Sequence, residues 1–158
     1  DLPLFAQYSI IPSVQPSHAV SDYLFAEKRI GAERLKGAYA YQSLLNTTGI
    51  IALGTDFPVE DMNPFKTIYA ACARKNEKEK PDGGFNMQEA ISLDDCLKGM
   101  TLWAALASFQ ESFIGQLVKD MDATFVIFER KIQVSNSFQR NFALQTYIKG
   151  VKVYSVDG

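Results

Sequence analysis

The sequence predicts an α/β fold, and three observations carry this prediction. Residues 49–54 form a continuous apolar segment, which is typical of a parallel strand covered on both faces. An amphipathic helix follows over residues 64–75, where apolar side chains recur at helical spacing. Residues 123–128 and 144–156 are two further strand segments, the second with a turn signal at Lys149-Gly150. We therefore expect a small antiparallel sheet at the C-terminal end.

The chain has 158 residues, of which 47% are hydrophobic and 22% charged. That length and composition suit one globular domain with a sizeable core. With 16 basic against 18 acidic side chains, the net charge of -2 argues against a nucleic-acid-binding domain. No apolar run approaches the roughly 18 residues that a transmembrane helix needs. The opening Asp1-Leu2-Pro3 does not have the character of a secretory signal, so we expect a cytoplasmic protein with no membrane partner.

The first half of the chain alternates between short strands and helices. Residues 1–8 are expected to be a short helix. A β-branched strand over residues 9–15 is interrupted by Pro12 and ended by residues 16–18. The remaining expected elements are a helix over residues 21–34 broken at Gly31, a brief strand over 37–40 and a helix over 41–46.

The second half carries clearer helix boundaries. Pro64 fits the first turn of the helix over residues 64–75. Residues 76–84 form a charged loop that we interpret as solvated. Ser92 has the character of an N-cap, with Asp95 as a capping-box variant, and a kink or a junction of two short helices is expected between Gly99 and Thr101.

Three side chains on the helical stripes of this half are expected in the core. Trp103 is predicted to pack there as an ordinary apolar residue. Cys72 and Cys96 also lie on helical stripes and are interpreted as reduced packing residues. A disulfide between the two cysteines is left open by the sequence.

His18 and Asp56 are the candidate chemical residues. Each follows the C-terminal end of a predicted strand, and ligands gather at that edge of parallel sheets. An imidazole and a carboxylate suit a divalent metal such as zinc, and a carboxylate can also accept a proton from water. The alternatives are a hydrogen-bonded loop histidine and an aspartate that caps an Asx-turn. Two ligands alone do not complete a zinc site.

At these residues the sequence resembles the YtcJ-like amidohydrolases (amidohydrolase family 3). Residues 13–22 are similar to the family's Ser-Val-Gln-Pro-x-His-x-x-x-Asp segment. Residues 53–59 are similar to its Gly-Ser-Asp-x-Pro-Val segment, with Thr55 in place of serine. Weaker similarities follow at residues 31–39, 70–74, 101–115, 122–127 and 146–154. Their common order makes the resemblance specific over essentially the whole chain.

The resemblance implies the C-terminal part of a (β/α)₈ TIM barrel, about strands six to eight, over residues 1–118. Residues 119–158 would belong to a small, composite β-sandwich domain. His18 would be a metal ligand after strand six. Asp56 would be the catalytic aspartate after strand eight, both metal ligand and general base. Gln15, Phe57 and Pro58 would contact a small amide-type substrate, and the cofactor would be one or two divalent ions, with zinc expected.

The resemblance also implies that part of the enzyme is missing from this chain. A complete barrel takes about 250 residues. The family's His-x-His, its strand-four ligand and its strand-five histidine have no counterpart here, because His18 is the only histidine. We therefore expect a C-terminal fragment of a C–N hydrolase that is inactive alone. It would self-associate through open barrel edges or pair with the missing N-terminal half.

Two other hypotheses stay open from the sequence. The chain could be a non-catalytic interaction module on a degenerate amidohydrolase scaffold, or an unrelated small α/β binding domain in which Asp56 is a cap. The second of these predicts no cleft that joins His18 to Asp56.

Overall fold

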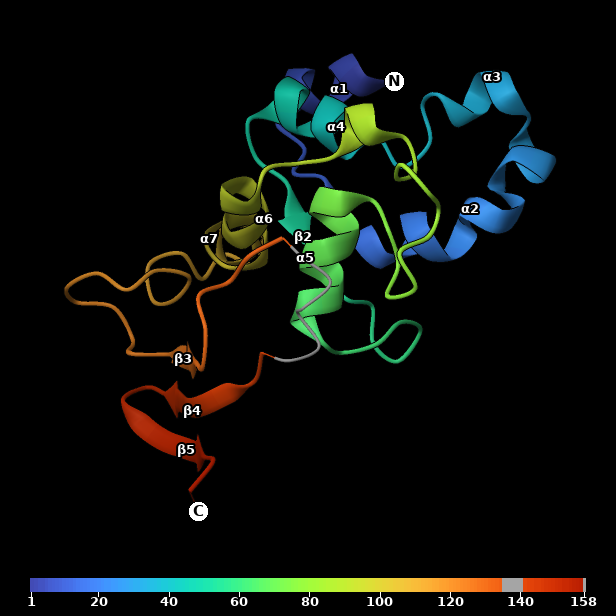
Figure 1. Cartoon of the computed structure of the whole chain (residues 1–158). Coiled ribbons are helices and arrows are strands. Elements are labelled where there is room, and N and C mark those ends of the chain that lie inside the picture. Colours follow the sequence, from blue (N-terminus) through green and yellow to red (C-terminus); the bar gives the residue numbers. More distant parts are fainter. Residues whose placement is uncertain (135–140, 158) are drawn as a thin grey trace.

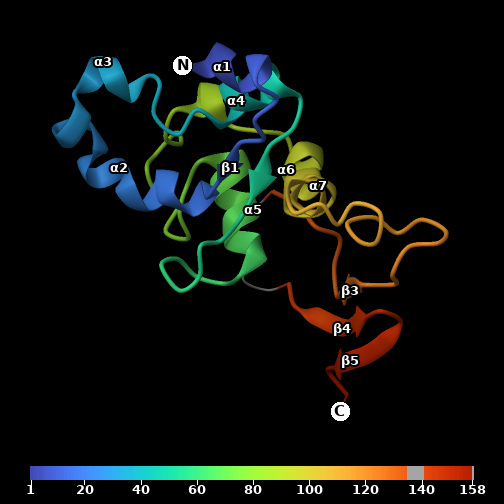
Figure 2. The same ribbon diagram turned by 180° about the vertical axis from the view of Figure 1, so that it is seen from behind.

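The computed structural model describes residues 1–134 and 141–157. Two views of the ribbon show a helical part, with a pair of short strands inside it, and a three-stranded sheet apart from the helices (Figures 1 and 2). A long loop after helix α7 joins the two parts. The chain is therefore α/β, as the sequence predicts.

The helical part is built around a parallel pair of strands, β1 (Ser13–Val14) and β2 (Ala52–Leu53). Ser13 pairs with Ala52 and Val14 with Leu53. The ladder extends by one bond at each end, from Ala52 N–H to the Pro12 carbonyl at 2.8 Å and from Gly54 N–H to the Val14 carbonyl at 3.0 Å. Both strands are shorter than predicted, because each bonds to only one neighbour, and Pro12 and Pro16 flank β1 without N–H donors.

Helices α1 (Leu2–Gln7), α2 (Pro16–Ile30), α3 (Ala32–Leu35) and α4 (Tyr41–Thr48) belong to the first half. The break at Gly31 is confirmed, since this residue has φ of 80°. The predicted start of the second helix at residue 21 is wrong. Helix α2 begins at Pro16, whose fixed φ suits the first helical position, and His18 therefore lies in a helix rather than in a turn.

The strand predicted over residues 37–40 is also wrong. Tyr39 has φ of 54°, in the left-handed region that no strand residue adopts. Backbone bonds from Gly37 to the Arg34 carbonyl and from Ala38 to the Leu35 carbonyl close turns there. As a result β1 and β2 are direct neighbours, with no strand between them.

Helices α5 (Pro64–Ala73), α6 (Leu93–Met100) and α7 (Leu102–Ala107) pack beside β2, with the 3₁₀ turn η1 (Met87–Glu89) before α6. The predicted caps are confirmed. Pro64 opens α5, and the Ser92 hydroxyl accepts from Asp95 N–H at 3.0 Å while donating to the Asp95 carboxylate at 2.7 Å. The predicted junction of two short helices is also confirmed, at Thr101.

The core lies between β1, β2 and helices α2, α4, α5 and α6. Trp103 is buried, as predicted. Cys72 and Cys96 are free thiols, Cys96 buried and Cys72 half-buried. Besides Trp103, the large buried side chains of this core are Tyr41, Leu45, Ile51, Leu53, Phe65, Ile68, Tyr69, Phe85 and Ile91.

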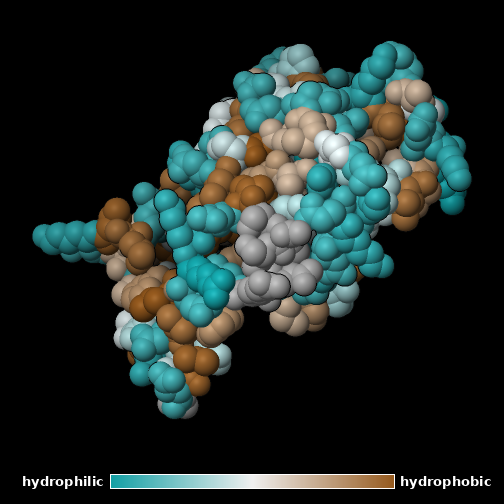
Figure 3. Space-filling model, viewed as in Figure 1, coloured by the Kyte–Doolittle hydropathy of each residue, from teal (hydrophilic) through white to brown (hydrophobic). Residues whose placement is uncertain are grey.

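The antiparallel sheet is confirmed and consists of β3 (Phe125–Phe128), β4 (Ala143–Ile148) and β5 (Val151–Ser155) in that order. The β4–β5 hairpin turns at Lys149-Gly150, both with positive φ. Residues 135–140 and 158, which we expected in the β-domain, lie outside the described residues. Apolar side chains gather on the surface of this part of the molecule (Figure 3), and the exposed apolar residues of the three strands include Val126, Val151 and Val153.

An apolar cavity of about 750 Å³ separates the sheet from the helical part. Its walls come from α5, α6 and α7 on one side and from β3 and β4 on the other. Phe65 of α5 crosses to Phe128 of β3, with ring centroids 5.0 Å apart. Among the described helices, none has the length and apolar character needed to cross a bilayer.

Candidate metal centre

The parallel pair brings His18 and Asp56 to one edge of the molecule. Because β1 and β2 run in the same direction and in register, their C-terminal ends lie side by side. Helix α2 starts directly after β1 and carries His18 in its first turn. The loop after β2 carries Asp56. The sequence prediction that these two residues share an edge is therefore matched by the register of the strands.

The two side chains meet. His18 Nε2 lies 3.5 Å from Asp56 Oδ2, and the side chains are 28% and 47% exposed. The Nε2 atom itself is buried and has no hydrogen-bond partner in the part of the chain that the structure describes. A buried ring nitrogen without a partner is costly in a folded protein. This nitrogen faces the Asp56 carboxylate at a distance that suits either an ion pair or two ligands of one cation.

The backbone at Asp56 leaves the carboxylate available. Asp56 has φ of 59°, a left-handed conformation that is uncommon outside glycine and that concentrates at functional sites. The turn that follows is closed by Val59 N–H, which donates to the Asp56 main-chain carbonyl at 2.8 Å. The Phe57 N–H contacts the Thr55 hydroxyl at 3.3 Å. The turn thus uses the main chain and Thr55, and the Asp56 carboxylate faces His18 instead of acting as a cap.

The geometry of the pair fits a divalent metal. Two ligands bound at ordinary zinc distances to one tetrahedral ion lie about 3.3 to 3.5 Å apart. An imidazole nitrogen with no other partner and a carboxylate oxygen are both ordinary zinc ligands. Over residues 1–134 and 141–157, no third His, Cys, Asp or Glu joins them in a metal-binding group. The pair supplies part of a coordination sphere.

Two side-chain contacts that the sequence did not predict hold the helix of His18 in place. Ser21 Oγ donates to Glu60 Oε1 at 2.7 Å, which ties α2 to the loop of Asp56. Asp22 Oδ2 accepts from the Tyr39 hydroxyl at 2.6 Å. Burial and this bond raise the pKa of Tyr39. The signal was present in the spacing, because Ser21 and Asp22 lie one helical turn beyond His18.

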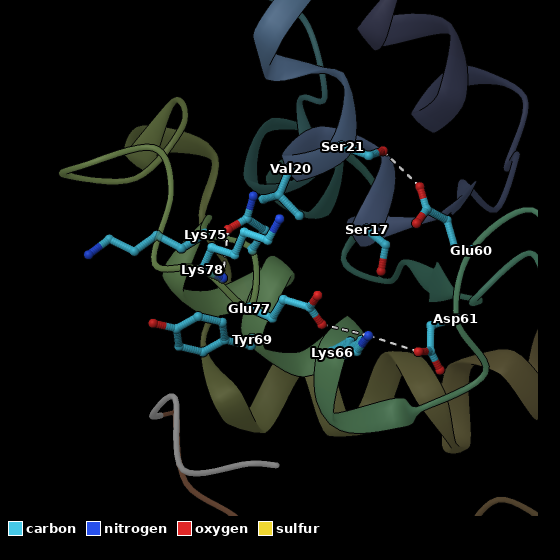
Figure 4. A pocket seen from close by; sticks show the side chains of 11 residues that line it. Ser17, Val20, Ser21, Glu60, Asp61, Lys66, Tyr69, Lys75, Glu77 and Lys78 are labelled. Atoms are coloured by element: carbon cyan, nitrogen blue, oxygen red, sulfur yellow. Dashed lines mark hydrogen bonds and ion pairs between the residues drawn. The ribbon is translucent and has the colours of Figure 1, made fainter.

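A polar cavity of about 270 Å³ lies beside the candidate centre, between α2, the loop of Asp56 and the charged loop after α5 (Figure 4). Lys66 crosses it and bonds to Asp61 at 2.8 Å and to Glu77 at 2.7 Å. These bonds raise the pKa of Lys66, and the Lys66 ammonium holds the pKa of Asp61 below its usual value. The charged loop is exposed at Glu77, as predicted, and half-buried at Glu79, which accepts from the Tyr69 hydroxyl at 2.6 Å.

The candidate substrate residues lie around the pair. Phe57 is 58% exposed and Pro58 is exposed beside it, next to Asp56. Gln15 is the N-cap of α2, and its main-chain carbonyl accepts from the Tyr41 hydroxyl at 3.0 Å. Phe57 and Pro58 thus lie next to Asp56, and Gln15 lies at the start of the helix that carries His18. That these three residues contact a substrate stays a prediction.

The chain matches the model of the amidohydrolase family over residues 2–154. It therefore belongs to this family, and the resemblance to the YtcJ-like amidohydrolases is confirmed. It is 36% identical to the protein LONG AFTER FAR-RED 3 of Arabidopsis thaliana over 154 residues, which cover 95% of this chain and 26% of that protein. It is 28% identical to the candidate amidohydrolase YtcJ of Bacillus subtilis, over 77% of this chain and 23% of that protein. The chain thus spans about a quarter of the length of these relatives.

The chain is also similar to solved structures of hydrolases. An uncharacterised metal-dependent hydrolase from Pyrococcus horikoshii superposes with a TM-score of 0.69 and 28% identity, over 77% of this chain and 24% of that one. An amidohydrolase from Thermotoga maritima superposes with a TM-score of 0.66 and 20% identity. The match covers 98% of this chain and 34% of the Thermotoga chain. The Thermotoga likeness shows the fold alone.

Proposed function

We propose that the complete protein is a metal-dependent hydrolase that cleaves C–N bonds of amides or cyclic amides, with His18 and Asp56 as two of its metal ligands. The observation that carries this proposal is the 3.5 Å approach of His18 Nε2 to Asp56 Oδ2 at the C-terminal edge of the parallel strands. Membership of the amidohydrolase family and the similarity to a metal-dependent hydrolase of known structure support it.

The two residues have different parts in the reaction. His18 would offer its Nε2 atom, which faces Asp56, as a ligand to the metal. His18 and Asp56 would hold a divalent cation, for which zinc suits this donor pair, and the bound ion would make water a stronger acid and the substrate carbonyl a better electrophile. Asp56 takes the proton from the attacking water and returns it to the leaving nitrogen. The exposed Phe57 and Pro58 flank the substrate, and Gln15 borders it from the start of α2.

The site needs groups beyond those this chain supplies. Two donors hold a divalent ion far more loosely than four. We propose that the remaining ligands come from other strands of a TIM barrel, in which β1 and β2 would be two neighbouring strands. Their direct pairing does not fit the positions six and eight expected from the resemblance, because the seventh strand lies between those two in a closed barrel. The isolated chain would then be inactive. Each of the two strands has a free edge in the described part of the chain, and we propose that these edges pair with the rest of the protein or with a second copy.

The test compares two carboxylates of one loop in the complete gene product. Asp56→Asn keeps the size of the side chain and removes the base. We expect kcat on a panel of N-acyl amino acids, hydantoin and formamides, with zinc supplied, to fall at least about a hundredfold. Asp61→Asn is the matched control, since Asp61 bonds to Lys66 and does not contact His18. Retained turnover in Asp56→Asn would remove the assigned role.

A further inference from the structure

The hydroxyl of Tyr41 is bound to the first turn of α2, the turn that carries His18. This hydroxyl donates to the main-chain carbonyl of Gln15 at 3.0 Å. The same carbonyl accepts from the main-chain N–H of His18 at 3.1 Å. One oxygen atom therefore joins Tyr41 to the backbone of the candidate metal ligand, and the side chain that fixes this oxygen also fixes the start of the helix.

The ring of Tyr41 is itself held by a buried arginine. The guanidinium carbon of Arg74 lies 4.9 Å from the centroid of the Tyr41 ring and 5.7 Å from that of Phe85. Arg74 is 0% exposed and Tyr41 is 3% exposed. Arg74 Nε donates to the Phe85 carbonyl at 2.7 Å, and Phe85 N–H donates to the Arg74 carbonyl at 2.8 Å. The cation is thus fixed at the end of α5 by reciprocal bonds.

Stability alone does not account for this cation. Among residues 1–134 and 141–157, neither of the buried Nη atoms of Arg74 has a hydrogen-bond partner. Burial lowers the pKa of the Arg74 guanidinium, and the nearby Tyr41 and Glu89 oppose this effect. Moving a charged group out of water is costly, and the cation–π contacts with two rings offset part of that cost. Because Arg74 packs on the Tyr41 ring, it also limits where that ring can lie.

We infer that Tyr41 is a positioning residue for His18, with Arg74 holding the Tyr41 ring in place. This inference rests on the proposed role of His18 as a metal ligand. By bonding the Gln15 carbonyl, Tyr41 fixes the turn from which the His18 ring reaches Asp56. Groups that orient a ligand without touching the metal typically contribute ten- to hundredfold in affinity.

The test measures zinc affinity rather than activity. In the complete gene product, Tyr41→Phe keeps the ring under Arg74 and removes only the hydroxyl. We expect the zinc affinity, measured by competition with a chelator, to fall about tenfold or more. The matched control is Tyr147→Phe, which removes a hydroxyl bonded to Gln145 at 2.9 Å in the distant sheet. The melting temperature of the metal-free protein should fall no further in Tyr41→Phe than in this control.

Two comparisons separate the possible failures. If His18→Gln binds zinc as tightly as the wild type, the metal-ligand role fails and the positioning inference fails with it. If His18→Gln loses zinc but Tyr41→Phe does not, the positioning inference alone is overturned. Arg74→Lys should weaken zinc binding in the same direction. The double variant should be no weaker than Tyr41→Phe, since Arg74 acts through Tyr41, and an additive loss would remove Arg74 from the inference.

Discussion

The hydroxyl of Ser21 lies 2.7 Å from Glu60 Oε1, and this bond joins the helix of His18 to the loop of Asp56. Strand β1 fixes the start of the helix that carries His18, and strand β2 fixes the start of the loop that carries Asp56. Both the helix and the loop leave the sheet before they reach the candidate centre. The Glu60 N–H also contacts the Asp56 carbonyl, at 3.4 Å. Glu60 therefore lies between Asp56 and the helix that carries its partner.

Removing the Ser21 hydroxyl should loosen the loop without unfolding the protein. Ser21 is exposed, so Ser21→Ala should change the free energy of unfolding by less than about 1 kcal/mol. Amide exchange in residues 57–63, followed by mass spectrometry, should nevertheless become several-fold faster, because this loop loses its bond to α2. Ser108→Ala is the control, since its hydroxyl bonds only within its own helix end. Unchanged exchange in residues 57–63 would contradict the assignment.

Helix α6 approaches β2 so closely that only glycine fits at residue 99. A Cβ added to Gly99 would lie 2.7 Å from Leu53 Cγ and 2.9 Å from the Ile51 carbonyl oxygen. Gly99→Ala should therefore destabilise the protein by about 1 to 3 kcal/mol, measured by chemical unfolding. At Gly37 the nearest atom to an added Cβ is the Arg34 carbonyl oxygen, at 3.9 Å. Gly37→Ala should be neutral or slightly stabilising, and equal effects of the two substitutions would count against a tight α6–β2 contact.

Local chemistry in the sequence predicted the elements whose boundaries it controls. Pro64 and Ser92 begin helices because proline suits the first turn and a serine hydroxyl caps it. The Lys149-Gly150 turn likewise fixed the hairpin. The prediction that His18 and Asp56 lie close together rested on one further rule, that the C-terminal ends of parallel strands lie at the same edge of a sheet.

The sequence could not predict features that depend on contacts between distant segments. Residues 37–40 have the composition of a strand, but the Tyr39 hydroxyl bonds to Asp22 of helix α2 and the Tyr39 backbone is left-handed. Arg74 is charged and would be expected in solvent, yet two aromatic rings enclose it. Both departures from local expectation lie next to the helix of His18, where tertiary contacts outweigh propensity.

The two cysteines should differ in reactivity. The interaction between the two thiols lowers the pKa of Cys72. The same interaction and burial raise the pKa of Cys96. Because the thiolate is the reactive form, iodoacetamide at pH 8 should modify half-buried Cys72 at least about ten times faster than Cys96. Peptide mapping of timed samples measures both rates, and equal rates would contradict the prediction.

Stability at alkaline pH should depend on Tyr41. Burial raises the pKa of Tyr41 from 10.0 to about 12. Because the folded state favours the neutral phenol, Tyr41 adds to the free energy of unfolding. This stabilisation is complete below pH 10 and is lost as the pH rises from 10 through 12. That loss amounts to about 2 to 3 kcal/mol. Chemical unfolding between pH 9 and about 11.5 should therefore show a smaller loss of stability in Tyr41→Phe than in the wild type. Tyr8→Phe is the control, because Tyr8 is 66% exposed, and its stability should change with pH as that of the wild type does. If the plots of stability against pH are parallel for all three proteins, burial does not raise the pKa of Tyr41.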